Sequence, residues 1–307
     1  MRTPPPRSGA DDRRPLADLA GFSPVDSTNG VTLAVHLLAG TPQDRPLLLA
    51  HATGFHALAW LPLARQLNGF QVVAPDLRGH GDSTQPIDRG LEWDGFADDI
   101  LAVVDAMAAA GIATTGLLAA GHSKGGAALL LAEQRRPGTF GALYCYEPVV
   151  MPSDDALGTP SDSVGGNLLA EGALRRRDQF ASRAEAIANY SGKLPFSALD
   201  PEALDAYVDH GFADQDDETV RLKCRPELEA AVYRMGGTHR AFDHLGDVRC
   251  PVTIAMGMTS AFGPAAFAAR IADALPRGRL ETFPDLGHFG PLEDPHRIAT
   301  HIMASFN

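Results

Sequence analysis

The chain has 307 residues, of which 45% are hydrophobic and 21% are charged. These fractions are close to those of soluble globular proteins, so they exclude a disordered or fibrous body and allow either one large domain or a core with an insertion. The formal net charge of −12 opposes attraction to phosphate backbones and anionic lipids, so we expect neither nucleic acid nor a membrane as a partner.

The N-terminal region, residues 1–22, is predicted to be a flexible tail. It is rich in proline, arginine and aspartate and has no apolar segment typical of a secretion signal. The longest apolar runs, such as residues 113–120, are far shorter than the ~20 residues of a membrane-spanning helix. The three cysteines show neither a disulfide framework nor paired metal-type spacing. We therefore expect a soluble protein of the cytoplasm.

From residue 31 onward the sequence alternates between strand and helix patterns. Short apolar runs predict buried strands, whereas apolar residues at helical spacing predict a helix from Phe96 to Gly111. The other predicted strands and helices cover residues 31–38, 47–50, 71–74, 116–120, 142–146, 252–255 and 279–283, and residues 126–136, 265–274 and 296–304, respectively. This alternation indicates the α/β class, with a mostly parallel central sheet and helices on both faces.

The alternation is interrupted over residues 151–243. This stretch is polar and helix-prone, has several acidic clusters and contains few β-branched runs. We predict that it forms an inserted helical cap, and that residues 23–150 and 244–307 form the α/β core.

A candidate nucleophile, Ser123, lies in the sequence Gly121-His122-Ser123-Lys124-Gly125. This Gly-x-Ser-x-Gly motif follows a predicted strand and opens a predicted helix, which is the setting of a nucleophile elbow. A serine on so tight a turn needs neighbours without side chains, and the two glycines meet that need. The alternative is a glycine-rich turn with no catalytic role.

Three further segments occur in a fixed order around the elbow. They are His51–Phe55 after the third predicted strand, Asp76–Ser83 after the fourth, and Gly287–Phe289 after the last. With these four segments the chain resembles the α/β-hydrolase superfamily over roughly residues 30–150 and 245–307. The resemblance implies that family's fold and the activity of a serine hydrolase.

The resemblance also implies roles for individual residues. His288 follows the serine in chain order, as the catalytic base of this family does. The backbone N–H groups of Thr53 and Lys124 are the expected oxyanion donors, although the loop reads His-Ala-Thr-Gly where the family usually has His-Gly-x. The segment Asp76–Ser83 corresponds to a structural turn near the site, so His80 is not expected to be the base.

The acid of the triad departs from the common pattern. Most family members carry an aspartate shortly after the strand that ends here at Gly257, but no carboxylate occurs between Pro251 and Ala272. Glu147, at the end of the strand after the nucleophile helix, is the predicted acid, as in certain dehalogenases and zearalenone lactonases. Asp285 is the alternative acid, and a site without any acid is a third possibility.

These residues predict a serine hydrolase that cleaves an ester or lactone of apolar character through an acyl-enzyme. We expect no cofactor and no metal, because the required residue spacings do not occur. Ser123 excludes the alkyl-enzyme chemistry of relatives with an aspartate nucleophile. Phe55 and Phe289 are predicted pocket walls, with core packing as the alternative. Carbon–carbon bond hydrolysis, perhydrolase or haloperoxidase activity, and non-catalytic ligand binding are alternative functions.

Overall fold

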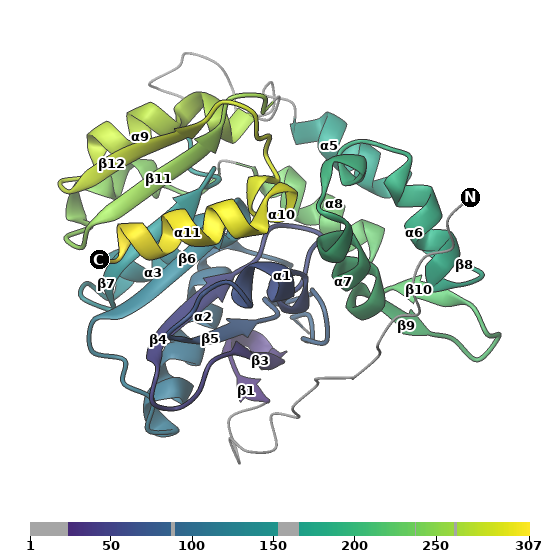
Figure 1. Cartoon of the computed structure of the whole chain (residues 1–307), viewed down its shortest axis with the longest axis horizontal. Helices are drawn as coiled ribbons and strands as arrows, with labels where there is room; N and C mark the ends of the chain where they lie inside the picture. The colour runs from purple at the N-terminus through teal and green to yellow at the C-terminus, as the bar shows by residue number, and fades with distance from the viewer. Residues whose placement is uncertain (1–23, 87–89, 153–165, 237, 261–262) are drawn as a thin grey trace.

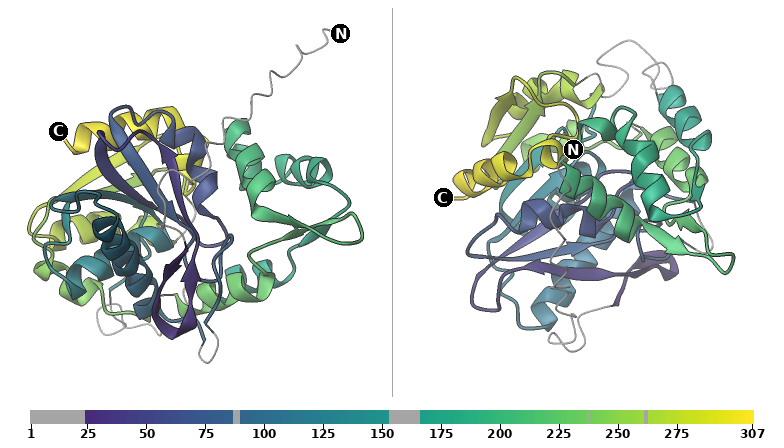
Figure 2. Two further views of the ribbon diagram at one scale, coloured as in Figure 1. Left: turned by 90° about the horizontal axis from the view of Figure 1, so that it is seen from below. Right: turned by 45° about the vertical axis from the view of Figure 1, so that its right-hand side comes forward.

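A computed structural model describes residues 24–86, 90–152, 166–236, 238–260 and 263–307. The predicted flexible tail, residues 1–22, lies outside these ranges. Figures 1 and 2 show a central sheet with helices on both sides and a separate group of helices beside it.

The central sheet has seven strands in the order β12-β11-β7-β6-β4-β5-β3. Adjacent strands are parallel except β3 and β5, which are antiparallel. The predicted α/β class with a mostly parallel sheet is therefore confirmed. The strands are β3 (Val35–Ala39), β4 (Arg45–Ala50), β5 (Phe70–Pro75), β6 (Leu117–His122), β7 (Phe140–Tyr146), β11 (Val252–Gly257) and β12 (Gly278–Phe283), and a small hairpin pairs β1 (Val25–Asp26) with β2 (Thr32–Leu33).

Helices cover both faces of the sheet because successive residues of each strand point to opposite faces. In β4, Leu48 belongs to the hydrophobic cluster that includes residues of α2, α3 and α9, whereas Leu47 and Leu49 belong to the cluster that includes residues of α1 and α11. No helix in the described ranges is both long and apolar enough to span a bilayer. The helices are α1 (Leu61–Ala64), α2 (Trp93–Ala109), α3 (Lys124–Arg135), α9 (Ala268–Ala274), α10 (Gly290–Glu293) and α11 (Pro295–Ser305), with short 3-10 helices at Thr28–Gly30, Ala57–Trp60, Phe242–Asp247 and Gly263–Phe267.

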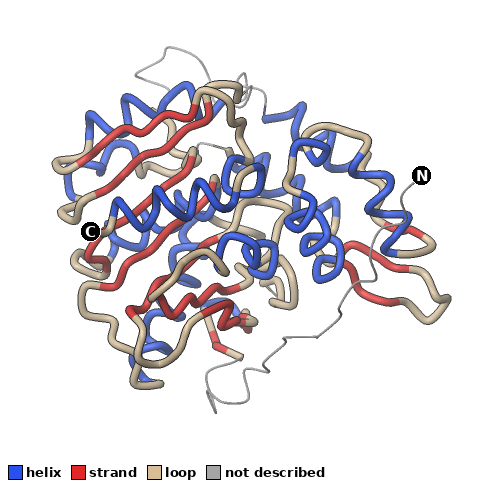
Figure 3. Tube along the Cα trace, in the orientation of Figure 1, coloured by secondary structure: helices blue, strands red, loops and turns tan. Residues whose placement is uncertain are grey.

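Residues 166–236, which we call the inserted segment, lie beside the core, at the right in Figures 1 and 3. They fall within the predicted helical cap and also contain a small sheet of order β8-β10-β9, which the sequence did not predict. Its strands have only two or three residues, too short for a periodic pattern. The elements are α5 (Gly166–Leu174), β8 (Gln179–Phe180), α6 (Arg183–Ser191), a 3-10 turn (Phe196–Ala198), α7 (Pro201–Gly211), β9 (Phe212–Asp214), β10 (Val220–Leu222) and α8 (Pro226–Met235).

Candidate active site

Ser123 lies at the turn between β6 and α3, where the parallel strands end. Its φ of 53° and ψ of −115° are unusual for a residue with a side chain, so the surrounding structure must hold this conformation. The Ser123 N–H donates to the Tyr146 carbonyl at 2.9 Å, and the Ser123 carbonyl accepts from the N–H groups of Ala127 and Val149 at 3.1 and 3.2 Å. The turn is thus fixed both to its own helix and to the end of β7.

The two glycines of the elbow allow α3 to pack tightly on the sheet. A Cβ atom on Gly125 would lie 2.1 Å from the Ala50 carbonyl oxygen, and one on Gly121 would lie 2.7 Å from the Gly125 carbonyl carbon. Neither position can accept a side chain without moving the backbone. The motif therefore has the steric basis expected of a nucleophile elbow.

Glu147 and His288 form a direct contact at the same edge of the sheet. His288 Nδ1 lies 2.6 Å from Glu147 Oε2, and the Glu147 side chain is fully buried. The carboxylate also accepts from the Gly257 N–H at 3.0 Å and from the Ser260 hydroxyl at 2.9 Å. A proton on Nδ1 directed at this carboxylate leaves Nε2 as the basic nitrogen of His288.

Asp285, the alternative acid, lies on the surface. Its carboxylate oxygens are 2.8 and 3.0 Å from Arg297 Nη1, and its side chain is 68% exposed. The hydrogen bond from Arg297 lowers the pKa of Asp285. Of the two candidate carboxylates, Glu147 is the one that contacts His288.

His122 packs beside the base. Its ring centroid lies 4.9 Å from that of His288, and the residue is only 1% exposed. Burial and the nearby His288 hold the pKa of His122 well below its ordinary value. His122 is therefore neutral where it packs against the His288 ring.

Ser123, His288, Phe289 and Thr53 line one cavity of about 100 Å³. A larger, open hollow of about 680 Å³ lies elsewhere and contains none of the predicted site residues, although Trp93 borders both. Several residues that line the small cavity are not marked by any sequence motif, because they come from distant segments that only the tertiary fold brings together. The remaining lining residues are Ala52, Trp93, Val149, Met151, Leu169, Val232, Tyr233, Gly236 and Pro264.

The loop of residues 52–55 carries the predicted oxyanion donor Thr53. The Phe55 N–H donates to the Ala52 carbonyl at 3.3 Å, which closes a turn. Gly54 lies beside the inserted segment, because a Cβ atom at this position would lie 2.6 Å from Glu229 Oε1. The second predicted donor, the Lys124 N–H, belongs to the first turn of α3, where amides have no acceptor within the helix. The geometry is consistent with Thr53 and Lys124, whose role as donors stays a prediction.

The two predicted aromatic walls differ in their surroundings. Phe289 lines the cavity. Phe55 packs against the rings of Phe289, Tyr207 and Phe196, with centroids 5.4, 4.9 and 5.9 Å away. Phe55 therefore belongs to the hydrophobic core between the sheet and the inserted segment, which was the alternative role for this position.

The Lys124 side chain is completely buried. Its Nζ atom lies 3.3 and 3.4 Å from the two ring nitrogens of His80 and 4.7 Å from the centroid of the Phe96 ring. Burial lowers the pKa of Lys124 to about 7. The ammonium form is thus less favourable in the folded protein than in the unfolded chain.

The substitution Lys124→Met should therefore change the pH dependence of stability. Between pH 7 and 10 the unfolded wild type binds more protons than the folded one, so its free energy of unfolding rises with pH relative to the variant, by up to about 1.4 kcal/mol per pH unit. Urea unfolding at pH 7, 8, 9 and 10 measures this difference. Parallel curves for the two proteins would show that Lys124 has the same pKa in both states.

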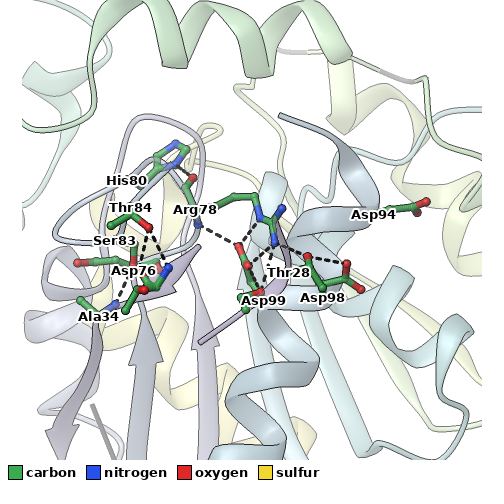
Figure 4. A network of polar contacts seen from close by, with 12 residues as sticks. Thr28, Ala34, Asp76, Arg78, His80, Ser83, Thr84, Asp94, Asp98 and Asp99 are labelled. Carbon is green, nitrogen blue, oxygen red and sulfur yellow. Dashed lines mark hydrogen bonds and ion pairs between the residues drawn. The ribbon is translucent and has the colours of Figure 1, made fainter. Parts of the chain in front are cut away.

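The segment Asp76–Ser83 forms the polar network of Figure 4. Arg78 makes a buried ion pair with Asp99, with Nη2 and Oδ1 2.7 Å apart and side chains 1% and 0% exposed. Asp76 accepts from the backbone N–H groups of Ala57 and Asp82 at 2.7 and 2.9 Å. These contacts anchor loops to the core, as expected of a structural turn.

Removing one partner of the buried pair should destabilise the fold strongly. Asp99→Ala leaves the Arg78 guanidinium buried without its carboxylate, and we expect a loss of about 3–5 kcal/mol in the free energy of unfolding. Asp105→Ala is the matched control, because Asp105 also lies on α2 but pairs with Arg136 at the surface, and such pairs contribute about 0–1 kcal/mol. If chemical denaturation showed equal losses in the free energy of unfolding for the two variants, the buried pair would not have the stabilising role proposed for it.

A serine on a strained strand–helix turn, next to a histidine–carboxylate pair at the carboxyl end of a parallel sheet, is typical of hydrolases. A sequence profile of the Alpha/beta hydrolase family matches residues 47–301. The chain belongs to this family. No cluster of three or more histidine, cysteine or acidic side chains suited to a metal ion occurs among the residues that the structure describes.

Comparison with individual proteins gives more distant similarities. Human monoglyceride lipase is 31% identical over 122 residues, which span 39% of this chain and only 40% of the lipase. A putative carbamate hydrolase from Variovorax paradoxus is 26% identical over 256 residues, 81% of this chain and 86% of that protein. The solved structure of an E-2-(acetamidomethylene)succinate hydrolase has a TM-score of 0.76 at 21% identity, covering 90% of this chain and 95% of the other, which shows a shared fold.

Proposed function

We propose that the protein hydrolyses small carboxylic esters or lactones with a Ser123–His288–Glu147 triad. The observation that carries the proposal is the 2.6 Å contact between His288 Nδ1 and Glu147 Oε2, in a site where His288 and the strained Ser123 line the same cavity. This arrangement supplies a nucleophile, a base with a defined tautomer and a buried carboxylate to stabilise the imidazolium.

The reaction proceeds in two half-reactions. The Ser123 hydroxyl attacks the substrate carbonyl and its proton passes to His288 Nε2, while the N–H groups of Thr53 and Lys124 hold the oxyanion. His288 then protonates the leaving alkoxide, and the acyl group remains on Ser123. Water, deprotonated by His288, releases the acyl group as a carboxylic acid and restores the serine.

The cavity supports a small and largely apolar substrate. Its volume of about 100 Å³ and its lining by side chains such as Val149, Leu169 and Val232 favour a short acyl group. The relative named as a monoglyceride lipase acts on an ester. The relative named as a putative carbamate hydrolase would cleave a carbamate, which also has a carbonyl carbon that a nucleophile can attack. We further propose that the reaction takes place in the cytoplasm, in keeping with the odd number of cysteines.

Covalent labelling with a fluorophosphonate, followed by peptide mass spectrometry, tests the nucleophile. We expect a single adduct on the peptide that contains Ser123. The same preparation is then assayed on aryl esters of increasing acyl length and on lactones, with turnover expected to be fastest for short acyl groups. Labelling at another residue would contradict the proposed triad.

The assay panel also separates the alternative functions. If no ester or lactone is turned over but a β-diketone or meta-cleavage product is cleaved, carbon–carbon bond hydrolysis replaces the proposal. Formation of a peracid from a carboxylic acid and hydrogen peroxide, without esterase activity, would indicate a perhydrolase. A protein that binds a small ligand but resists the fluorophosphonate would be a non-catalytic binder.

A further inference from the structure

The inserted segment contacts the loop of residues 52–55 at Gly54, the residue after Thr53. A Cβ atom on Gly54 would lie 2.6 Å from Glu229 Oε1 and 3.6 Å from Arg176 Nη1. Arg176 and Glu229 both belong to the inserted segment, so this segment occupies the space that a side chain at position 54 would need.

The conformation of Gly54 defines the turn that carries Thr53. Its φ is +77°, and the turn is closed by the Phe55 N–H and the Ala52 carbonyl. Positive φ at the third residue is the pattern of a type II turn, in which the central peptide has one of two opposite orientations. A contact that holds Gly54 in place therefore fixes the Thr53–Gly54 peptide. The Thr53 N–H belongs to the preceding peptide of the same turn, so it is held in place as part of the turn as a whole.

Glu229 is suited to hold Gly54 because it is itself held rigidly. It lies on α8, is 6% exposed, and its Oε2 atom accepts from Arg176 Nη1 at 2.9 Å. Arg176 also donates from Nε to the Tyr190 hydroxyl at 3.2 Å and from Nη2 to the Tyr207 hydroxyl. A buried guanidinium with several fixed partners restricts the carboxylate to one position.

The same carboxylate lies beside the cavity. Tyr233, which lines the cavity with Ser123, donates its hydroxyl to Glu229 Oε1 at 3.4 Å. Glu229 Oε1 is also the atom that faces Gly54. One oxygen atom thus connects a cavity wall of the inserted segment with the loop that carries Thr53.

We propose that Glu229, held by Arg176, is a positioning residue that fixes the 52–55 turn and thereby directs the Thr53 N–H at the oxyanion. This inference rests on the proposed function, because it takes Thr53 as an oxyanion donor. It assigns the inserted segment a part in the chemistry, in addition to forming the cavity wall.

The substitution Glu229→Ala tests the proposal by removing the contact with Gly54. On a short aryl ester we expect kcat to fall about tenfold to a hundredfold, as for a displaced oxyanion donor, with KM changed by less than about threefold. Labelling of Ser123 by a fluorophosphonate should slow by a similar factor, because the phosphonyl oxygen requires the same amide. A purely structural role would not give this pattern of lower kcat with retained KM.

A second variant keeps the test valid if Glu229→Ala does not fold. Arg176→Met combined with Glu229→Leu replaces the buried pair by apolar side chains of similar size, which proteins often tolerate, and the same loss of kcat is expected. Glu171→Ala is the matched control, because Glu171 pairs with Arg175 at 3.5 Å on the surface of the inserted segment and should leave kcat within about twofold of the wild type.

The outcomes separate a failure of the proposed function from a failure of the positioning role of Glu229. Wild-type protein without ester or lactone hydrolysis, or without a Ser123 adduct, would contradict the proposed function before any variant is compared. An active wild type with unchanged kcat in a folded Glu229 variant would overturn the positioning role alone. A rise in KM with kcat retained would also overturn it, since Glu229 would then only shape the cavity.

Discussion

Replacement of Ser123 by alanine is expected to reduce ester hydrolysis by about 10⁵- to 10⁶-fold, to the level left by binding and the oxyanion donors alone. The reason is that no acyl-enzyme can form without the hydroxyl, and His288 and Glu147 then have no nucleophile to activate. Steady-state rates on the best ester of the panel measure the loss, and fluorophosphonate labelling should disappear with it.

A matched control separates the loss of the nucleophile from damage to the fold. Ser191→Ala changes an exposed serine of the inserted segment and should leave kcat and labelling unchanged. The melting temperature of Ser123→Ala should stay close to that of the wild type, because alanine tolerates the same backbone about as well as serine. Activity of Ser123→Ala within a hundredfold of the wild type would contradict the assignment of the nucleophile.

Replacement of Glu147 by glutamine is expected to lower kcat by about 10³- to 10⁴-fold, by analogy with loss of the acid in other triads. The Gly257 N–H, 3.0 Å from Oε1, should select the amide oxygen of the new side chain. Its NH₂ group then faces His288 Nδ1, which must become an acceptor and carry its proton on Nε2. The base would have the wrong tautomer, and its positive form would lose the compensating carboxylate.

Asp285→Asn is the control for the acid, because Asp285 also lies close to His288 in sequence but pairs with Arg297 at the surface. It should change kcat by less than about twofold. Circular dichroism and thermal unfolding of Glu147→Gln establish that the fold is retained. Near-normal activity of Glu147→Gln, with a large loss in Asp285→Asn, would reverse the assignment.

Most of the core could be predicted from the sequence because its strands are buried on both faces. The predicted strands at residues 47–50 and 71–74 correspond to β4 and β5. Their apolar runs are sufficient to predict a buried strand without knowledge of the residues that pack against them. The single strand predicted at residues 31–38 is divided into β2 and β3. The helix predicted over residues 265–274 begins with a 3-10 turn, which the same apolar spacing does not distinguish from an α-helix.

The candidate site was predictable only where local motifs mark it. The elbow pattern indicated Ser123, and the glycine-flanked position after the last strand indicated His288. Glu147 emerged because the loop after β11 has no carboxylate. By contrast, Ser260 and Tyr233 reach the site through tertiary contacts. The sequence alone does not show whether Phe55 lines the cavity or packs in the core. In the structure its ring packs against Tyr207, and its neighbour Gly54 is the residue that lies against Glu229.

The position of the proposed acid, directly after β7, has an evolutionary consequence for the loop that follows β11. In the common arrangement that loop must present the triad carboxylate, which restricts its length and sequence. Here its link to Glu147 is the Ser260 hydroxyl, while Pro264 borders the cavity and Met258 is 62% exposed. This chain can therefore vary the cavity wall at Pro264 without altering the groups proposed to transfer protons, so substrate range and catalytic power can evolve separately.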